Sequence, residues 1–285
     1  MKLRHALTSV VMGVGLAVSS MSSAAERIVS ADNALTEIVY ALGAGDQVVG
    51  VDTTSRYPSE AAKLPQVGYK RALAAEGVLS LSPTLLIATE DSGPPVVLEQ
   101  VKEAGVTVDV MSAAPTLAAV EEKIGRVANL LGRTEQGEQL WTTVQAEVAD
   151  AKARVAAVQE PLRVLFILSY GDHGIVVGGA NTGADQMLKM AGAVNVASGI
   201  EGYKPMTPEA IIAARPQQLV VMSGGRAEIT SEQLWADPAL SLTPAAESRR
   251  VLAIGGAYML GYGPRIGQAL NTLTEAFYPE LADTQ

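Results

Sequence analysis

Two stretches of the sequence decide the fold: Glu76-Gly-Val-Leu-Ser-Leu-Ser-Pro-Thr-Leu-Leu-Ile-Ala88 and Glu209-Ala-Ile-Ile-Ala-Ala-Arg-Pro-Gln-Gln-Leu-Val-Val221. In both, a glutamate stands seven residues before a proline, and an apolar run follows the proline. This pattern predicts a short helix, a proline-marked stop and a buried parallel strand. Because the unit occurs once in each half of the chain, we expect two similar lobes of one α/β design. The alternative is a chance match of two helix–strand units within a single sheet.

Further strand patterns surround these two stretches and alternate with helical ones, which predicts central, mainly parallel sheets. The expected strands are 27–30, 48–51, 85–87 and 107–110 in the first half, and 163–168, 218–222 and 250–254 in the second, with a closing helix over 264–277. Ligands of such sheets bind beyond the carboxyl ends of the strands. We therefore expect a pocket between the loops 30–33, 52–57, 68–71 and 89–93 of the first lobe and the loops 169–179, 222–226 and 255–263 of the second.

Between the two halves, residues 116–160 show no strand pattern. Their apolar residues recur at spacings of three, four and seven, which is typical of an amphipathic helix. Gly132 and Gly137 interrupt the pattern. We predict one long rigid backbone helix, or two helices in line, that joins an N-terminal lobe of residues 26–115 to a C-terminal lobe of residues 161–285.

The start of the chain has the features of a secretory signal peptide. Lys2 and Arg4 precede an apolar run over residues 6–20, and small residues at 22–25 provide a cleavage site. The apolar run is short for a membrane anchor, the alternative, which needs about 20 residues. We expect residues 1–25 to be removed and the remaining chain to be a soluble periplasmic protein.

The composition excludes several classes of function. Without Lys2 and Arg4, 19 basic residues remain against 30 acidic ones, a net charge of −11, so nucleic acid is not an expected partner. There is no cysteine, and the only histidines are His5 and His173. A zinc site of the usual His/Cys type is therefore unavailable, and a catalytic triad would have to be built on His173 alone.

The run Gly68-Tyr69-Lys70-Arg71 carries the strongest chemical signal. Residues two apart in an extended loop point the same way, so Arg71 is expected beside the Tyr69 phenol. A neighbouring guanidinium favours the phenolate, and tyrosinate is one of the few axial ligands of haem iron. The alternative is a tyrosine packed on its loop with a solvated arginine next to it.

The organisation into two lobes joined by a helix resembles class III periplasmic binding proteins, the substrate-binding proteins of bacterial ABC importers for haem, vitamin B12 and iron-siderophores. Within that superfamily, the residues 68–71, followed by Leu73 and Glu76-Gly77, resemble the haem-binding branch, as does the closing run 261–265. The resemblance implies that haem is the transported ligand, that Tyr69 ligates its iron and that Arg71 supports Tyr69. It implies a binding protein and not an enzyme.

The resemblance also implies partners. Members of the superfamily use one exposed glutamate on each lobe to dock arginines of the inner-membrane ABC permease, which works with its ATPase, and Glu76 and Glu209 hold matching positions in the two repeats. Without the resemblance, each would be an ordinary acidic residue near a helix N-terminus, where the helix dipole favours negative charge. Haem would reach the protein from an outer-membrane haem receptor system.

Several further residues are candidates for contact with haem. The predicted contacts are His173, Arg226, Tyr258, Met259 and Tyr262, and Lys70, Arg56 and Lys204 are further cations for the propionates. Some haem-binding relatives recruit a histidine of the second lobe for a second, stacked haem; the alternative for His173 is a solvated loop residue.

Other readings remain open. A periplasmic hydrolase would need a nucleophile motif such as Gly-x-Ser-x-Gly, which the chain lacks. Vitamin B12 or a ferric siderophore is the rival ligand within the transport class. Two Trp and two Phe in the whole chain offer little for an aromatic cage, whereas Tyr-x-Arg suits a ferric centre.

Overall fold

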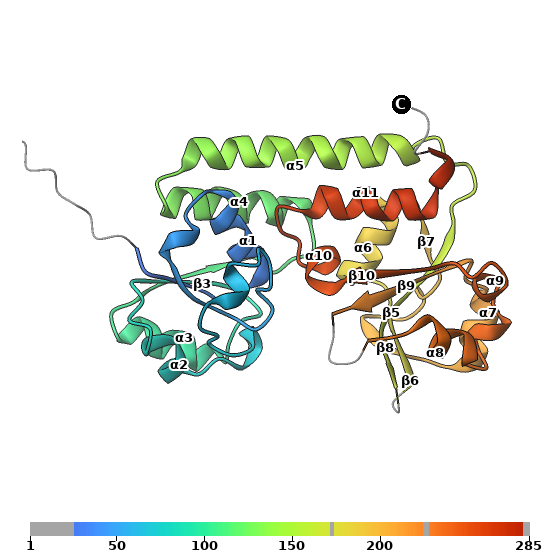
Figure 1. Cartoon of the computed structure of the whole chain (residues 1–285), viewed down its shortest axis with the longest axis horizontal. Helices are drawn as coiled ribbons and strands as arrows, with labels where there is room; N and C mark the ends of the chain where they lie inside the picture. Colours follow the sequence, from blue (N-terminus) through green and yellow to red (C-terminus); the bar gives the residue numbers. More distant parts are fainter. Residues whose placement is uncertain (1–25, 172–173, 225–227, 282–285) are drawn as a thin grey trace, which may run out of the picture.

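The computed structural model describes residues 26–171, 174–224 and 228–281, and it contains two β-sheets on one side of a layer of helices (Figure 1). The predicted signal peptide lies outside the described residues. Within the described part of the chain, no helix is both long enough and apolar enough to cross a bilayer.

The first sheet is fully parallel and has the strand order β2-β1-β3-β4. Its strands are β1 (Ile28–Ser30), β2 (Val48–Val51), β3 (Leu85–Thr89) and β4 (Thr107–Met111), and its helices are α1 (Asn33–Ala41), α2 (Ala75–Leu79) and α3 (Pro95–Glu103). Asp32 starts α1 because its carboxylate accepts the backbone N–H groups of Ala34 and Leu35. The four strands expected in this half are confirmed.

The second sheet is mixed, with the order β10-β9-β5-β6-β8 and β7 on β5. Its strands are β5 (Arg163–Gly171), β6 (Gly174–Gly178), β7 (Val194–Asn195), β8 (Tyr203–Met206), β9 (Gln218–Ser223) and β10 (Val251–Gly255), and its helices are α6 (Gly183–Met190), α7 (Pro208–Ala214), α8 (Ser231–Ala236), α9 (Pro244–Glu247), α10 (Gly256–Leu260) and α11 (Ile266–Phe277). The expected strands β5, β9 and β10 are parallel to one another, while β6 and β8 run antiparallel and were not predicted.

The connecting segment consists of α4 (Leu117–Leu130) and α5 (Thr134–Val155). The expectation of two helices in line is wrong, because α5 folds back along α4. Gly132 makes the reversal with a φ of +64°, a conformation that favours glycine. Gly137 does not bend α5; it lets the two helices approach, since a Cβ there would lie 2.5 Å from the Cβ of Ala128. α5 then continues past α4 to pack on α11, so it contacts helices of both halves (Figure 1).

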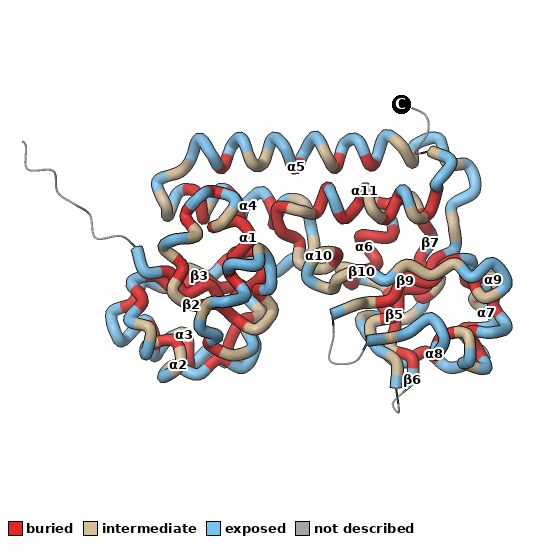
Figure 2. Tube along the Cα trace, in the orientation of Figure 1, coloured by how far each residue is buried: buried red, intermediate tan, exposed pale blue. Residues whose placement is uncertain are grey.

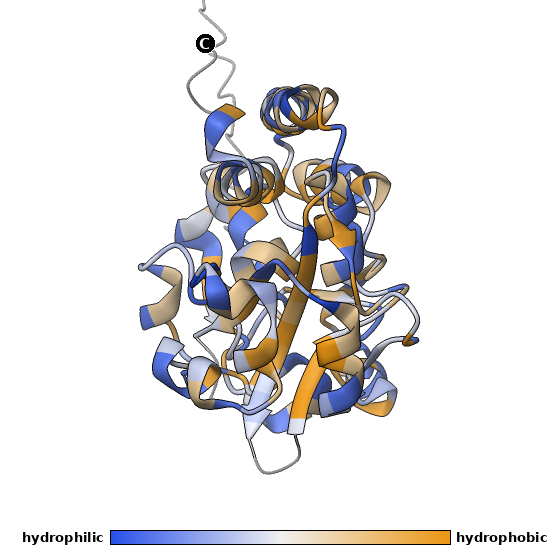
Figure 3. Cartoon of the chain, turned by 90° about the vertical axis from the view of Figure 1, so that its right-hand side faces the viewer, coloured by the Kyte–Doolittle hydropathy of each residue, from blue (hydrophilic) through white to orange (hydrophobic). Residues whose placement is uncertain are grey.

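Each sheet has one face in a core shared with the helix layer and another face in a core of its own. In β3, Leu85 and Ile87 belong to the shared core, while Leu86 belongs to the separate one. In β5, Phe166 faces the shared core and Leu165 the separate one. This alternation follows from the period of two of a strand and explains why both strands are apolar throughout. Figures 2 and 3 show the result, with buried, hydrophobic strands inside a polar exterior.

A buried ion pair also links the two halves. Arg265, just before α11, donates from Nε and Nη2 to the two carboxylate oxygens of Glu37 on α1, at 2.7 and 2.6 Å. Its guanidinium carbon lies 3.8 Å from the ring centroid of Tyr57 and 4.9 Å from that of Tyr258. We call these four residues the Glu37–Arg265 clamp. It holds the first lobe against the start of α11.

Candidate ligand site between the lobes

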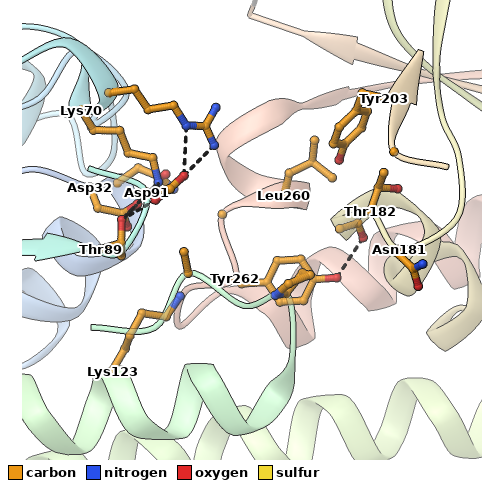
Figure 4. A pocket seen from close by; sticks show the side chains of 17 residues that line it. Asp32, Lys70, Thr89, Asp91, Lys123, Asn181, Thr182, Tyr203, Leu260 and Tyr262 are labelled. Atoms are coloured by element: carbon orange, nitrogen blue, oxygen red, sulfur yellow. Dashed lines mark hydrogen bonds and ion pairs between the residues drawn. The ribbon is translucent and has the colours of Figure 1, made fainter. Parts of the chain in front are cut away.

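Two adjoining cavities lie between the lobes at the carboxyl ends of the parallel strands. The outer cavity has a volume of about 570 Å³ and is lined by Thr53, Thr54, Arg56, Tyr69, Met222, Ser223, Gly224, Gly256 and Ala257. The inner cavity, next to α4, has a volume of about 320 Å³ and is lined by Asp32, Thr89, Asp91, Ala113, Pro115, Lys123, Asn181, Thr182, Gly183, Gly202, Tyr203 and Tyr262 (Figure 4). Both share Asn33, Lys70, Arg71, Leu260 and Gly261. Their volumes lie in the range of roughly 300–1,000 Å³ typical of small-molecule sites.

The loop that carries Tyr69 is fixed by its backbone. Gly68 has a φ of +102°, and its carbonyl accepts the N–H of Thr53 at 3.0 Å. The N–H of Gly93 donates to the carbonyl of Lys70 at 2.8 Å, and the buried side chain of Leu73 anchors the end of the loop. Tyr69 is nevertheless 42% exposed. A rigid backbone therefore presents a phenol oxygen to the outer cavity.

Arg71 holds the Tyr69 hydroxyl and is itself held by Asp91. Its Nη1 donates to Tyr69 Oη at 3.1 Å, while Nη2 and Nε donate to Asp91 Oδ2 at 2.5 and 3.2 Å. The hydrogen bonds that Arg71 donates to Asp91 raise the pKa of Arg71 further. The predicted side-by-side arrangement of Tyr69 and Arg71 is confirmed. The guanidinium therefore holds the phenol oxygen in place at the outer cavity.

Lys70 joins this group to the first helix. Its Nζ lies 2.7 Å from Asp32 Oδ2 and 2.8 Å from Asp91 Oδ1, and it donates to Thr89 at 3.3 Å. Burial disfavours the charged form of Asp91, but the hydrogen bonds from Lys70, Thr89 and Arg71 outweigh it and lower the pKa of Asp91 to about 2. Lys70 is thus engaged by two carboxylates.

The second lobe supplies a more neutral wall. Tyr262 is almost fully buried, has a φ of +49° and donates from its hydroxyl to the carbonyl of Gly183 at 2.9 Å. Thr182 caps α6 by accepting the N–H of Asp185. Arg56 reaches across from the first lobe and donates to the carbonyl of Gly224 at 3.2 Å. Of the second-lobe loops predicted to line the pocket, 222–226 and 255–263 contribute residues, whereas no described residue of 169–179 lines either cavity; residues 181–183 and 202–203 line the inner cavity instead.

The other predicted contacts have different outcomes. Tyr262 lines the inner cavity as expected. Met259 is fully buried in the shared core and lines neither cavity, which gives its predicted contact no support; Leu260, one position on, faces the cavities instead. Tyr258 lines neither cavity; its ring packs against Arg265 and its hydroxyl pairs with Thr272, and its predicted contact with haem stays a prediction.

His173 and Arg226 lie outside the described residues. Among the other cations, Arg56 and Lys70 line the outer cavity, whereas Lys204 is exposed on β8 and lines neither cavity.

Sequence reasoning missed Lys123, which points into the inner cavity from α4 (Figure 4). A signal for it exists in the sequence. Lys123 lies three residues after Val120 and four before Val127, so it occupies the apolar stripe of an amphipathic helix. A lysine at such a position is rare, because lysine side chains are almost never fully buried unless they are paired.

Glu76 and Glu209 occupy corresponding places. Each is exposed in the first turn of a short helix, α2 or α7, that leads into a strand of its sheet, β3 or β9. The two helices lie on different lobes (Figure 1). Among the described residues, no group of three or more His, Asp or Glu side chains could hold a metal ion.

Comparisons with known proteins agree with this architecture. Residues 28–258 match the pattern of a protein family that is described as "periplasmic binding protein". The periplasmic haem-binding protein RhuT from Roseiflexus sp. RS-1 is 43% identical, with a TM-score of 0.84 over 90% of this chain and 100% of that one. The periplasmic haem-binding protein BhuT, solved with two haems, is 38% identical, with a TM-score of 0.85 over 90% and 99%.

Curated relatives are more distant. The substrate-binding lipoprotein YvrC of an uncharacterized ABC transporter of Bacillus subtilis is 30% identical over 90% of this chain and 81% of its own. The vitamin B12-binding protein of Pectobacterium atrosepticum is 27% identical over 85% and 84%.

Proposed function

The chain belongs to the periplasmic binding protein family, and from that premise we propose that it captures haem between its lobes and delivers it to an inner-membrane ABC permease. The observation that carries the proposal is the Tyr69 phenol, exposed in the outer cavity and held at its oxygen by Arg71. The similarity to solved haem-binding proteins supports it.

The first lobe offers the chemistry that ferric haem requires. An oxygen donor suits ferric iron, and Arg71 holds the Tyr69 oxygen without competing for the metal, since a guanidinium is always protonated. Asp91 fixes Arg71 in place. Haem is cargo here, and the chain's own residues only bind and orient it.

Vitamin B12 and ferric siderophores are the second candidates. The names of curated relatives favour B12. Binding of a cobalamin would give the Tyr69–Arg71 pair no evident role. For this reason we rank vitamin B12 below haem as the ligand.

We propose that Glu76 and Glu209 dock the permease, which acts with its ATPase. Their exposure on separate lobes supports this role. The proposed place of action is the periplasm, reached by means of a cleaved signal peptide, and the proposed donor is an outer-membrane haem receptor system.

Optical titration of the purified protein with haemin tests the proposal. The wild-type protein should bind haemin with a high-spin ferric tyrosinate spectrum, and Tyr69→Phe should abolish this spectrum. The affinity of Tyr69→Phe for haemin should also fall. The loss should exceed the 10- to 100-fold loss that is typical of removing a residue that only supports a metal ligand. Tyr170→Phe is a matched control, because Tyr170 is a partly buried tyrosine outside both cavities. A protein that binds cyanocobalamin and not haemin would refute the proposal.

A further inference from the structure

Lys123 is a largely buried cation that faces the inner cavity. The residue is 2% exposed and lines the inner cavity. In Figure 4 its side chain rises from α4 toward the space between Asp32 and Tyr262. Within the described part of the chain it takes part in no hydrogen bond or ion pair, and the nearest charges act on it only through space. Its ammonium group faces the cavity, and holding a cation in a largely buried position without a counter-ion is costly, so an anion in the cavity would stabilise it.

The charges around the inner cavity do not balance. Asp32 and Asp91 face three cations, Lys70, Arg71 and Lys123. Lys70 lies between the two carboxylates and Arg71 is bound to Asp91, so the group is already paired without Lys123. One positive charge is left over, although the whole chain has a net charge of −9. The cavity is therefore suited to one anionic group.

The opposite wall adds to this positive potential. The amino end of α6 lies there, where Thr182 and Gly183 line the cavity. Helix amino ends carry a partial positive charge, which attracts anions. Lys123 and the start of α6 thus face the same space from opposite sides. Burial lowers the pKa of Lys123, and an anion beside it would oppose this effect.

We infer that the inner cavity is a subsite for one carboxylate of the transported ligand, bound by Lys123 opposite the amino end of α6. The inference rests on the proposed function, and in haem the carboxylate is a propionate. The two cavities share Lys70, Arg71 and Leu260 among their walls, so one ligand can occupy both. The porphyrin then lies at Tyr69 in the outer cavity, and the propionate extends inward.

A binding cycle tests the assignment. Haemin and its dimethyl ester, in which both propionates are neutral, are titrated into the wild-type protein, Lys123→Met and Lys123→Arg. Lys123→Met should weaken haemin binding roughly 10- to 100-fold, the range expected for one lost hydrogen bond to a charged group, and leave ester binding unchanged. Lys123→Arg should recover part of the affinity. Lys204→Met, the same change at an exposed lysine outside both cavities, should change neither.

Thermal unfolding of the ligand-free proteins gives a second readout. Because Lys123→Met removes a largely buried charge that has no ion-pair partner among the described residues, the variant should melt at the wild-type temperature or above it. A lysine with a purely structural role would show the reverse, lower stability and equal losses for both ligands.

Each outcome decides a separate point. Equal weakening of haemin and ester, or no weakening of either, would overturn the carboxylate subsite while leaving haem capture standing. If the cavity bound a free small anion and not the ligand carboxylate, Lys123→Met would affect haemin and its dimethyl ester equally. The carboxylate assignment would again be wrong. If the wild-type protein failed to bind haemin at all, the proposed function would fall and the propionate assignment with it.

Discussion

Removal of Arg265 from the Glu37–Arg265 clamp should destabilise the protein strongly. In Arg265→Leu, Glu37 keeps its burial, at 5% exposed, but loses both hydrogen bonds. Burial already raises the pKa of Glu37, and Arg265 offsets this only in part. Breaking a buried pair by removing one partner costs about 3–5 kcal/mol, and we take about 3 because the Arg265 side chain is 20% exposed. For a chain of this size that corresponds to a fall in Tm of roughly 6–12 °C.

The assay is thermal unfolding of the ligand-free protein followed by circular dichroism. Two further variants separate the charge effect from simple loss of packing. The double variant Glu37→Leu/Arg265→Leu should be less destabilised than Arg265→Leu, because it leaves no uncompensated carboxylate in the core. Arg126→Leu is the matched control: its ion pair with Asp109 is 2.6 Å long but the Arg126 side chain is 40% exposed, so the loss should be about 0.2–1 kcal/mol.

Two results would refute the reasoning. One is a Tm for Arg265→Leu within about 2 °C of wild type, which corresponds to less than roughly 1 kcal/mol. The other is a double variant that is less stable than the single one, which would show that the clamp stabilises through packing and not through its charges.

Three more predictions follow from the site. Arg71→Leu should weaken haem binding about fivefold, the effect of a charged hydrogen bond reduced for a side chain that is 59% exposed; haemin titrations that give the wild-type affinity would contradict this. Glu76→Lys and Glu209→Lys should leave the Kd for haem unchanged and reduce uptake through the cognate transporter, the double variant more than either single one; normal uptake by the double variant would rule docking out. The pKa of Asp91 is lowered to about 2, so its contribution to stability is present above pH 4 or so and is lost as pH falls toward about 2. Asp91→Asn should reduce by about 1 kcal/mol the amount by which the free energy of unfolding falls between these pH values. This figure is reduced for solvent screening because the Asp91 side chain is 28% exposed, and an acid unfolding curve identical to that of the wild type would contradict the prediction.

The first half of the site was predictable because its signals are local. Tyr69 and Arg71 lie two residues apart, and their contact follows from the direction of a short loop. The same holds for the segments around Glu76 and Glu209, in which a helix, a proline and an apolar strand follow one another without help from distant residues. The four predicted loops of the first lobe also line the cavities, whereas the loop 169–179 of the second lobe contributes no described residue to them.

Predictions failed where the outcome depended on packing between distant segments. Gly132 could have bent one long helix or reversed its direction, and the fit of Gly137 against Ala128 selects the reversal. Met259 and Leu260 are adjacent and both apolar, yet one is buried in the core and the other faces the cavity, because the docking of α10 fixes its rotation.

The sequence by itself determined the two-lobe α/β design and the Tyr69–Arg71 pair, because hydrophobic periodicity and short-range geometry are properties of neighbouring residues. Only the tertiary structure decided that Asp91 holds Arg71 from 20 residues away, that Arg265 joins Glu37 from the other end of the chain, and that Lys123 is buried in the cavity between the lobes. The physical reason is that burial and ion pairing depend on which surfaces meet when the helix layer closes over both sheets. That meeting is set by the summed packing of the whole chain, which no single stretch encodes.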